Sequence, residues 1–405
     1  MKNVRKIILV MLLTLPSLSF GESSVFALMP KSIGEYHYPF STAALGRGGF
    51  EIAFLDSVNI NQMNYSIWAF IPRTTLSIGL AYQRLSSESK INHINSFNGN
   101  FLGGFLAIPI VRRKMAIGFG VLPVTLNNQR FILKDVGVGA SADQTIKTDG
   151  TLSEVQAIVS YAPSKNLSFG IFMYYILGKI IDDFQIEYKD RTYGDILIQN
   201  QYHFYGKRPS IGVSAFYRLT ENVAIGGRIK LPAVIKVYAQ QESITSNTTI
   251  EKYQDVTFPI NWSTGLVWQP GERWAIGGDF DYIAWKNGYL FDGLTVSDMN
   301  NNYRLGVGVE YKPSTRRIIS YADKMNYRAG IFYGQLNFLS NNQAVNEYGF
   351  SLGLGLPITR GNSRLDVAFQ VGKRGDINTN GLSEMFFRFN FSLAANELWF
   401  IRDEQ

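Results

Sequence analysis

The sequence predicts an all-β fold, a transmembrane antiparallel β-barrel of about 14 strands with an N-terminal plug (hatch) segment. Three observations predict it. From about residue 74 the chain repeats one unit, an alternating run of about 10 to 16 residues followed by a turn. No stretch beyond the N-terminus approaches the roughly 18 to 20 apolar residues that a membrane helix requires. Finally, short and long connections alternate along the chain, as they do in outer-membrane barrels.

The alternating runs have one apolar face and one small or polar face. Leu76, Ile78 and Leu80 alternate with Ser77 and Gly79, and the run 387–394 repeats this pattern near the other end of the chain. Such a strand needs a dry environment on one side only. Because no helical segment is available to cover the apolar faces, they are expected to meet lipid around a polar interior.

Composition agrees with a barrel and excludes other classes. The chain has 405 residues, 46% of them hydrophobic, with 22 Tyr, 28 Phe, 6 Trp and 38 Gly, which suits aromatic girdles and small inward-facing residues. A secreted all-β soluble protein would show the same bias, so composition alone leaves that alternative open. The absence of Cys excludes disulfides, thiol catalysis and Cys-based metal sites. The formal charge is +7, and without Lys2, Arg5 and Lys6 of the N-terminal segment it is 7 − 3 = +4, spread over many turns without a basic stripe, so nucleic-acid binding is not expected.

Four regions are expected along the chain. Residues 1–21 read as a signal peptide, with a basic start, an apolar core from Ile7 to Leu15 and small residues at its end, so export is expected. Residues 22–73 do not alternate and form the plug segment. Its glycines Gly46, Gly48 and Gly49 permit close backbone approach, and they lack the strand-then-helix context and the Lys-Ser/Thr that would make them a phosphate loop. Residues 74–394 form the barrel, and 395–405 form a periplasmic tail.

The connections support this division. The expected strands are 74–84, 99–110, 114–125, 152–162, 166–183, 202–219, 222–238, 254–269, 273–286, 301–312, 325–339, 345–357, 364–374 and 383–394. Tight turns join strands two to three, four to five, six to seven, eight to nine and twelve to thirteen. Longer polar connections at 85–98, 126–151, 184–201, 239–253 and 287–300 lie between them. The connection 313–324 and the brief loops 340–344 and 375–382 depart from this alternation of short and long connections.

If the apolar side faces lipid, the charged residues of the strands face the lumen. The lumenal candidates for ligand binding are Arg304, Arg328, Arg228, Asp279, Asp281 and Arg388. An arginine could hold a carboxylate head group, although both signs of charge occur together and a structural salt-bridge network is the alternative for each residue. The strand 345–357 turns mainly Gly349, Gly353 and Gly355 inward, which leaves room for another segment to pack there.

Catalysis finds little support. His37, His93 and His203 lie in separate regions without a nucleophile elbow or HExxH pattern, so neither a triad nor a zinc site can be assembled. The pair Asp279 and Asp281 shares a lumenal face, as an outer-membrane protease could use, but such a pair also has a structural interpretation. No enzyme activity, metal or cofactor is predicted.

Several local patterns together resemble the FadL family of outer-membrane transporters for long-chain fatty acids and other hydrophobic compounds. The segment 41–49 is similar to the family's ALGxGG motif, and 259–266 with 281–285 is similar to its late strand pair. Tyr303-Arg304 and Tyr327-Arg328 open its recurring YRxG pattern. The family's Asn-Pro-Ala step is replaced here by 61–64, and Trp399 and Phe400 are internal to the tail rather than terminal.

The resemblance implies an outer-membrane barrel, plugged by its N-terminal segment, through which hydrophobic small molecules such as long-chain fatty acids or hydrocarbons diffuse passively. Pro109, Pro123 and Pro232 interrupt the second, third and seventh strands. Since proline removes a ladder hydrogen bond, Pro123 is the candidate for a strand kink with a lateral exit, and a bulge that only sets curvature is the alternative.

Three functional hypotheses follow. The first is a monomeric transporter whose partners are a hydrophobic ligand and outer-membrane lipid. The second is a non-transporting barrel with a permanent plug that binds proteins or assists secretion through its loops at 126–151 and 184–201. The third is a general porin, which requires an open lumen.

Overall fold

The structure is a computed structural model, and it describes residues 20–21, 24, 26, 33–90, 93–133, 142–189, 195–243, 248–296, 299–313, 320–358 and 363–397. The predicted signal peptide lies outside the described residues except for 20–21. Of the predicted tail, 398–405 lie outside them as well.

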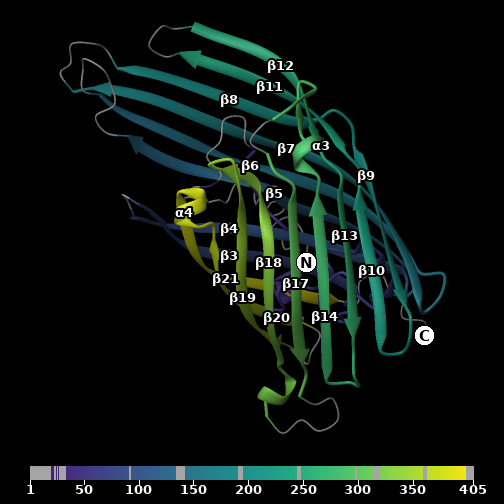
Figure 1. The fold of residues 1–405 in the computed structure, drawn as a ribbon. Coiled ribbons are helices and arrows are strands. Elements are labelled where there is room, and N and C mark those ends of the chain that lie inside the picture. The colour runs from purple at the N-terminus through teal and green to yellow at the C-terminus, as the bar shows by residue number, and fades with distance from the viewer. Residues whose placement is uncertain are drawn as a thin grey trace, which may run out of the picture.

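Within these ranges the strands pair into one closed antiparallel barrel of fourteen strands, which confirms the predicted fold class (Figure 1). Eleven of the fourteen are continuous over the described residues: β3 (Thr74–Ser89), β4 (His93–Val111), β5 (Met115–Leu133), β6 (Ala142–Tyr161), β7 (Leu167–Tyr188), β14 (Trp274–Ile283), β17 (Asn302–Tyr311), β18 (Asn326–Ser340), β19 (Gln343–Ile358), β20 (Ser363–Arg374) and β21 (Leu382–Glu397). The last strand pairs with the first, Phe389 opposite Tyr82, and this pairing closes the barrel.

The other three strands are each broken in two at a proline. The pairs are β8 (Ile196–Gly206) with β9 (Ser210–Arg218), β10 (Val223–Lys230) with β11 (Ala233–Ser243), and β12 (Thr248–Phe258) with β13 (Asn261–Trp268). Pro209, Pro232 and Pro259 lie in the three breaks, which are neighbours in the sheet. Because proline cannot donate to the ladder, the strands bend here. The sequence analysis identified the interruption at Pro232 but not those at Pro209 and Pro259.

Four of the five predicted long loops are shorter than expected. For example, β5 continues to Leu133 and β7 to Tyr188, so most of 126–151 and 184–201 is strand. Figure 1 shows β6, β7, β8, β11 and β12 running on together past the end of the barrel as a projecting sheet. Polar side chains occur on both faces of this sheet and most of its side chains are partly exposed, so the two-residue alternation is missing there, although the ladder hydrogen bonds continue.

The connection 284–301 remains mostly irregular. It contains α3 (Trp285–Gly288), β15 (Leu290–Phe291) and β16 (Leu294–Thr295), and β15 pairs with β12. We call this end of the barrel the long-loop end, which also carries α4 (Ile377–Asn380), and the opposite end the short-turn end, which carries η4 (Ala322–Lys324). None of the described helices has the length and apolar character that crossing a membrane requires.

The two faces of the wall divide as predicted. On β14, Trp274 is 46% exposed and Ile276 is 38% exposed, whereas Asp279 and Asp281 are each 2% exposed. On β17, Leu305 and Val307 point out while Arg304 is buried. Apolar side chains thus cover the outside, as a lipid-facing surface requires, and charged side chains face the lumen.

Residues 33–73, which we call the inner segment, lie inside the barrel. The inner segment contains β2 (Glu35–Tyr36), α2 (Thr42–Leu45) and the 3-10 helix η3 (Tyr65–Phe70), and β1 (Phe20–Gly21) precedes it. Most of its side chains between Phe40 and Ile71 are buried. It ends directly before β3 at the short-turn end, so the chain folds its first described residues into the lumen that the rest of the chain builds.

Candidate functional site: the lumen and its inner segment

The lumen has two chemically different faces. The apolar face is formed by β5, β6, β7, β8, β11 and β12, and its buried side chains include Leu122, Leu152, Ile158, Phe172, Ile176, Ile180, Phe204, Ile235, Val237 and Val256. The polar face is formed by β17 to β21 with β3 and β4, and its buried side chains include Gln83, Asn98, Arg304, Glu310, Arg328, Glu347, Asp366, Gln370, Arg374 and Asn390. The inner segment lies between these two faces.

Glycines seat the inner segment against the polar face. Gly48 and Gly49 have φ of 75° and 102°, a left-handed conformation that favours glycine. A Cβ at Gly330 would clash with the backbone of Arg47 and Gly48, and one at Gly353 would lie 2.9 Å from Cα of Gly46. The room expected over β19 is therefore filled by the predicted plug glycines, and the Gly48 N–H donates to Ser351 Oγ at 2.9 Å.

A buried ion-pair network fixes the inner segment near the short-turn end. Arg47 Nη1 lies 2.6 Å from Glu310 Oε2, and Arg328 Nε lies 2.7 Å from the same oxygen. Arg328 also binds Asp366 at 2.6 Å. Arg364 joins Asp366 to Asp56 of the inner segment. Three arginines thus face three carboxylates, and the buried charges compensate one another.

A second network lies nearer the long-loop end. Glu35 of β2 accepts from both terminal nitrogens of Arg374, and Arg388 Nη2 lies 3.6 Å from Glu35 Oε1. Arg374 also binds Glu347 at 2.6 Å, and Arg304 binds Glu347 at 2.9 Å. Arg304 lies over the ring of Phe40 at 5.3 Å. The inner segment is therefore held by charge near its start, at Glu35, and in its middle, at Arg47 and Asp56.

The remaining predicted site residues also contact protein groups. Asp279 Oδ2 accepts hydrogen bonds from the N–H groups of Glu51 and Ile52. Asp281 accepts from Ser263 Oγ, and Arg228 Nη2 lies 3.5 Å from that hydroxyl. The structure therefore places all six predicted lumenal residues inside the barrel, and each contacts a strand or the inner segment. Their role as ligand-binding residues stays a prediction.

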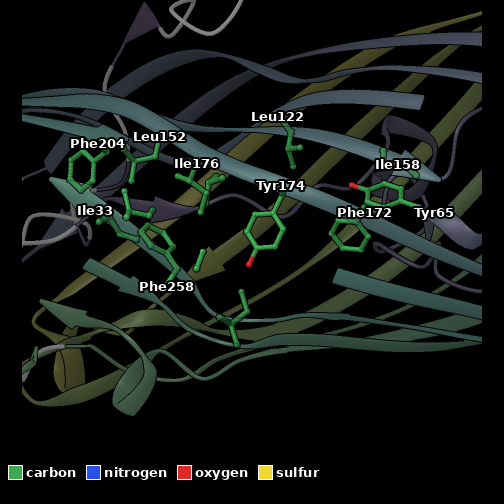
Figure 2. Close-up of a cluster of buried hydrophobic side chains, with 14 of the residues drawn as sticks. Ile33, Tyr65, Leu122, Leu152, Ile158, Phe172, Tyr174, Ile176, Phe204 and Phe258 are labelled. Carbon is green, nitrogen blue, oxygen red and sulfur yellow. The ribbon is translucent and has the colours of Figure 1, made fainter. Parts of the chain in front are cut away.

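The apolar face forms a continuous row of side chains along the lumen. Figure 2 shows it running from Phe204 and Leu152 past Ile176 and Tyr174 to Phe172 and Tyr65. At the end nearer the short turns, the row meets η3. There the Tyr65 ring packs edge-on against Phe172, with ring centroids 4.8 Å apart, and Trp68 packs against Phe105 at 6.1 Å. Sequence reasoning missed this row because β5, β6 and β7 carry apolar side chains on both faces, so their inward positions do not stand out from the outward ones.

The wall is incomplete beside this row. Pairing between β4 and β5 ends at Gly104 opposite Val121, although both strands continue toward the long-loop end within the described residues. Pro123 lies two residues beyond, and the register of β5 against β6 shifts between Pro123 and Thr125. The Val124 carbonyl, at the bulge, accepts from the N–H of His37. β2 pairs with β5 at Leu126 and β1 pairs with β4 at Gly99, so the N-terminal chain enters this gap.

The connection between β14 and β17 is pinned by Asp292. Its carboxylate accepts from the N–H of Asp255 at 3.1 Å and from Lys252 Nζ at 3.2 Å. Desolvation acts to raise the pKa of Asp292, but these hydrogen bonds, together with that from Gln254, outweigh it and lower the pKa. The described residues contain no cluster of three His, Asp or Glu side chains that could hold a metal ion.

Comparison with solved structures identifies the fold. A Pseudomonas aeruginosa FadL homologue superposes with a TM-score of 0.62 at 14% identity, covering 90% of this chain and 100% of that one. The Ralstonia pickettii toluene transporter TbuX gives a TM-score of 0.60 at 13% identity, covering 88% and 98%. The Pseudomonas putida toluene transporter TodX gives 0.56 at 13% identity, covering 89% and 98%. The barrel therefore has a FadL-like fold, as the sequence motifs indicated.

The sequence identifies the family of the chain. The model of the BamG family matches residues 4–404, and the chain belongs to that family. No curated protein sequence matches it.

Proposed function

We propose that this BamG-family protein is an outer-membrane channel that admits hydrophobic small molecules by passive diffusion. One observation carries the proposal. The apolar row of the lumen reaches Leu122 and Val124, the point where β5 has separated from β4. A hydrophobic solute would follow apolar side chains down from the projecting sheet and leave sideways into the membrane beside Pro123, once β1 and β2 had moved away from the edges of β4 and β5 with which they pair.

The fold and the wall chemistry support this proposal. TbuX and TodX, which have this fold, are both toluene transporters. The CymD monoaromatic hydrocarbon channel also has this fold, with a TM-score of 0.58 at 11% identity. Passive diffusion needs no cofactor. A lumen that apolar side chains line on one side favours apolar solutes over ions.

Uptake by proteoliposomes or by a strain lacking the gene tests the proposal. We expect a radiolabelled long-chain alkane or fatty acid to enter faster when the protein is present. We also expect Ile176→Gln, which puts an amide into the apolar row, to slow entry about tenfold because a buried unpaired amide is costly to desolvate. Ser164→Gln at an exposed turn is the matched control. Unchanged entry of every apolar compound would reject the transporter.

The ion-pair networks favour a second candidate, a barrel with a permanent inner segment that binds proteins. Moving the inner segment would separate Arg47 from Glu310 and Arg364 from Asp56, both buried pairs. The projecting sheet would then carry the function, and its outer strand β12 exposes Ile250 and Tyr253. A photocrosslinker at Tyr253 that captures one defined partner in cells, with no capture from the outward Ile331, would favour this candidate over the channel.

A further inference from the structure

A cavity of about 70 Å³, lined by both polar and apolar side chains, lies on the polar face of the lumen, outside the apolar row. Its wall comes from β3, β4, β20 and β21, and its floor comes from Tyr36, Tyr38 and Phe40 of the inner segment. This volume holds about five water-sized groups, since each needs roughly 10 to 15 Å³ of such space. The cavity therefore fits a small polar head group, but not a whole long-chain molecule.

Amide side chains meet at this cavity because the strand register places them together. Asn98, Gln83, Arg388 and Gln370 are direct cross-strand neighbours on four successive strands. In the adjoining row Asn100 and Asn390 flank Ala81, whose small side chain leaves the space open. Neighbouring strands thus supply a platform of carboxamides, which donate and accept hydrogen bonds without carrying charge.

Several polar side-chain atoms of the residues that line the cavity have no hydrogen-bond partner among the described residues. They are Asn98 Oδ1, Asn100 Oδ1, Gln370 Oε1, both side-chain polar atoms of Asn390, His37 Nδ1, and Nε and Nη2 of Arg304. Asn98 and Asn390 are each 1% exposed and Gln370 is fully buried. Buried polar atoms are costly to leave unpaired. The mixture of donors and acceptors matches hydroxyl groups, because each hydroxyl can both donate and accept.

The charges around the cavity are already compensated. Its three arginines, Arg304, Arg374 and Arg388, are matched by Glu35 and Glu347 and by Glu384, which lies behind the lining 3.8 Å from Arg374 Nη1. A carboxylate head group would add an unmatched buried charge, which is expensive in a low-dielectric site. The cavity therefore favours an uncharged head group over a fatty acid.

An apolar exit for a tail adjoins the amides. Leu102 of β4 and Leu126 of β5 also line the cavity, and both lie on the two strands beyond their last shared pair. A molecule whose head binds the amides could extend its tail into the gap between these strands. A tail placed there would take the room that β1 and β2 hold, since these two strands pair with the edges of β4 and β5 beyond Gly104 and Val121.

We propose that the cavity binds the uncharged, hydroxyl-bearing head group of a single-chain amphiphile, with its tail in the gap between β4 and β5. The proposal rests on the channel function proposed above and names its substrate class as neutral amphiphiles of the monoacylglycerol type. Asn98, Asn100, Gln370 and Asn390 bind the hydroxyl groups, and Arg304 donates to them.

Binding of tritiated 1-monooleoylglycerol to the purified full-length barrel in detergent tests this proposal, with oleate and hexadecane as competitors. We expect monooleoylglycerol to bind at least about tenfold more tightly than oleate. Asn390→Leu and Asn100→Leu, which keep the side-chain size and remove the hydrogen bonds, should each weaken monooleoylglycerol at least about fivefold and leave hexadecane unchanged. Asn346→Leu, at an exposed position of β19, is the control.

The outcomes separate this proposal from the channel proposal. Hexadecane binding combined with equal or tighter binding of oleate than of monooleoylglycerol overturns the head-group site and leaves the channel standing. Wild-type affinity for monooleoylglycerol in both leucine variants also overturns it, provided that both variants keep the heat-modifiable migration of a folded barrel. If none of the three compounds binds, the channel proposal fails and the head-group site fails with it.

Discussion

Arg328 of β18 binds Asp366 of β20 across the intervening strand β19, with Nη1 2.6 Å from Oδ1 and neither side chain exposed. The arginine can cross because Gly353 and Gly355 of β19 have no side chains, and a Cβ at Gly355 would lie 2.9 Å from Arg328 Nη2. The pair joins non-adjacent strands and, through Glu310, reaches Arg47 of the inner segment. It is therefore the centre of the contact between wall and inner segment.

We expect Arg328→Met to lower the free energy of unfolding by about 3 to 5 kcal/mol, because it leaves Glu310 and Asp366 with one buried positive charge too few. Denaturant unfolding in detergent, followed by tryptophan fluorescence, measures the change. Lys252→Met at the exposed pair with Asp292 is the control and should cost under about 1 kcal/mol. Equal effects of the two variants would show that the buried network does not stabilise the barrel.

We expect Gly330→Ala to displace the inner segment, because the new Cβ would overlap the backbone of Arg47 and Gly48. Overpacking of this kind costs about 1 to 3 kcal/mol. Gly227→Ala is a matched control, since its nearest neighbour beyond the adjacent residues is Ser263 O at 3.4 Å. Planar-bilayer recordings should show larger or noisier conductance for Gly330→Ala only. Equal conductance in both variants would mean that the inner segment tolerates the added methyl group.

The alternating pattern was sufficient to predict the barrel, because one-sided burial is repeated locally in each strand. It predicted the inward position of Asp279 and Arg304 for the same reason. It could not predict that Arg328 binds Asp366 or that Arg47 binds Glu310. Those pairs depend on strand register and on the path of the inner segment, which bring together residues far apart in the chain.

The strand extensions and breaks were missed for different reasons. The projecting sheet at 142–151 and 178–188 carries polar side chains on both faces, so no clear alternation marks it. Pro209 and Pro259 can be seen in the sequence, but neither shows by itself that its strand breaks. The three prolines form a common bend because Pro209, Pro232 and Pro259 lie side by side on three neighbouring strands. That alignment requires the pairing register, which a single sequence does not contain.

We expect Asp292→Asn to loosen the connection 284–301 at neutral pH by weakening its hydrogen bonds with Asp255 and Lys252. The pKa of Asp292 is lowered in the folded protein, so this stabilisation is present above the ordinary carboxyl value of about 3.9 and is lost as the pH falls below it. Hydrogen exchange of 285–296 measures the effect. Faster exchange should appear in the variant at pH 7 and in the wild type only under strong acid. Wild-type protection in Asp292→Asn at pH 7 would contradict this anchoring role.

Pro123 and Pro109 offer a comparison of two prolines beside register shifts. Pro109 lies where β4 and β5 are still paired, whereas Pro123 lies just after they separate. If the gap is the lateral exit, Pro123→Thr should restore a backbone donor, favour further pairing of β5 with β4, and reduce uptake of an apolar solute about threefold or more. Pro109→Thr restores a donor within paired strands and should leave uptake near the wild-type rate. A similar reduction in both variants would assign the bulge at Pro123 to barrel curvature, and unchanged uptake in both would place the exit elsewhere. Measuring initial uptake rates at equal amounts of folded barrel separates a narrowed exit from a loss of protein.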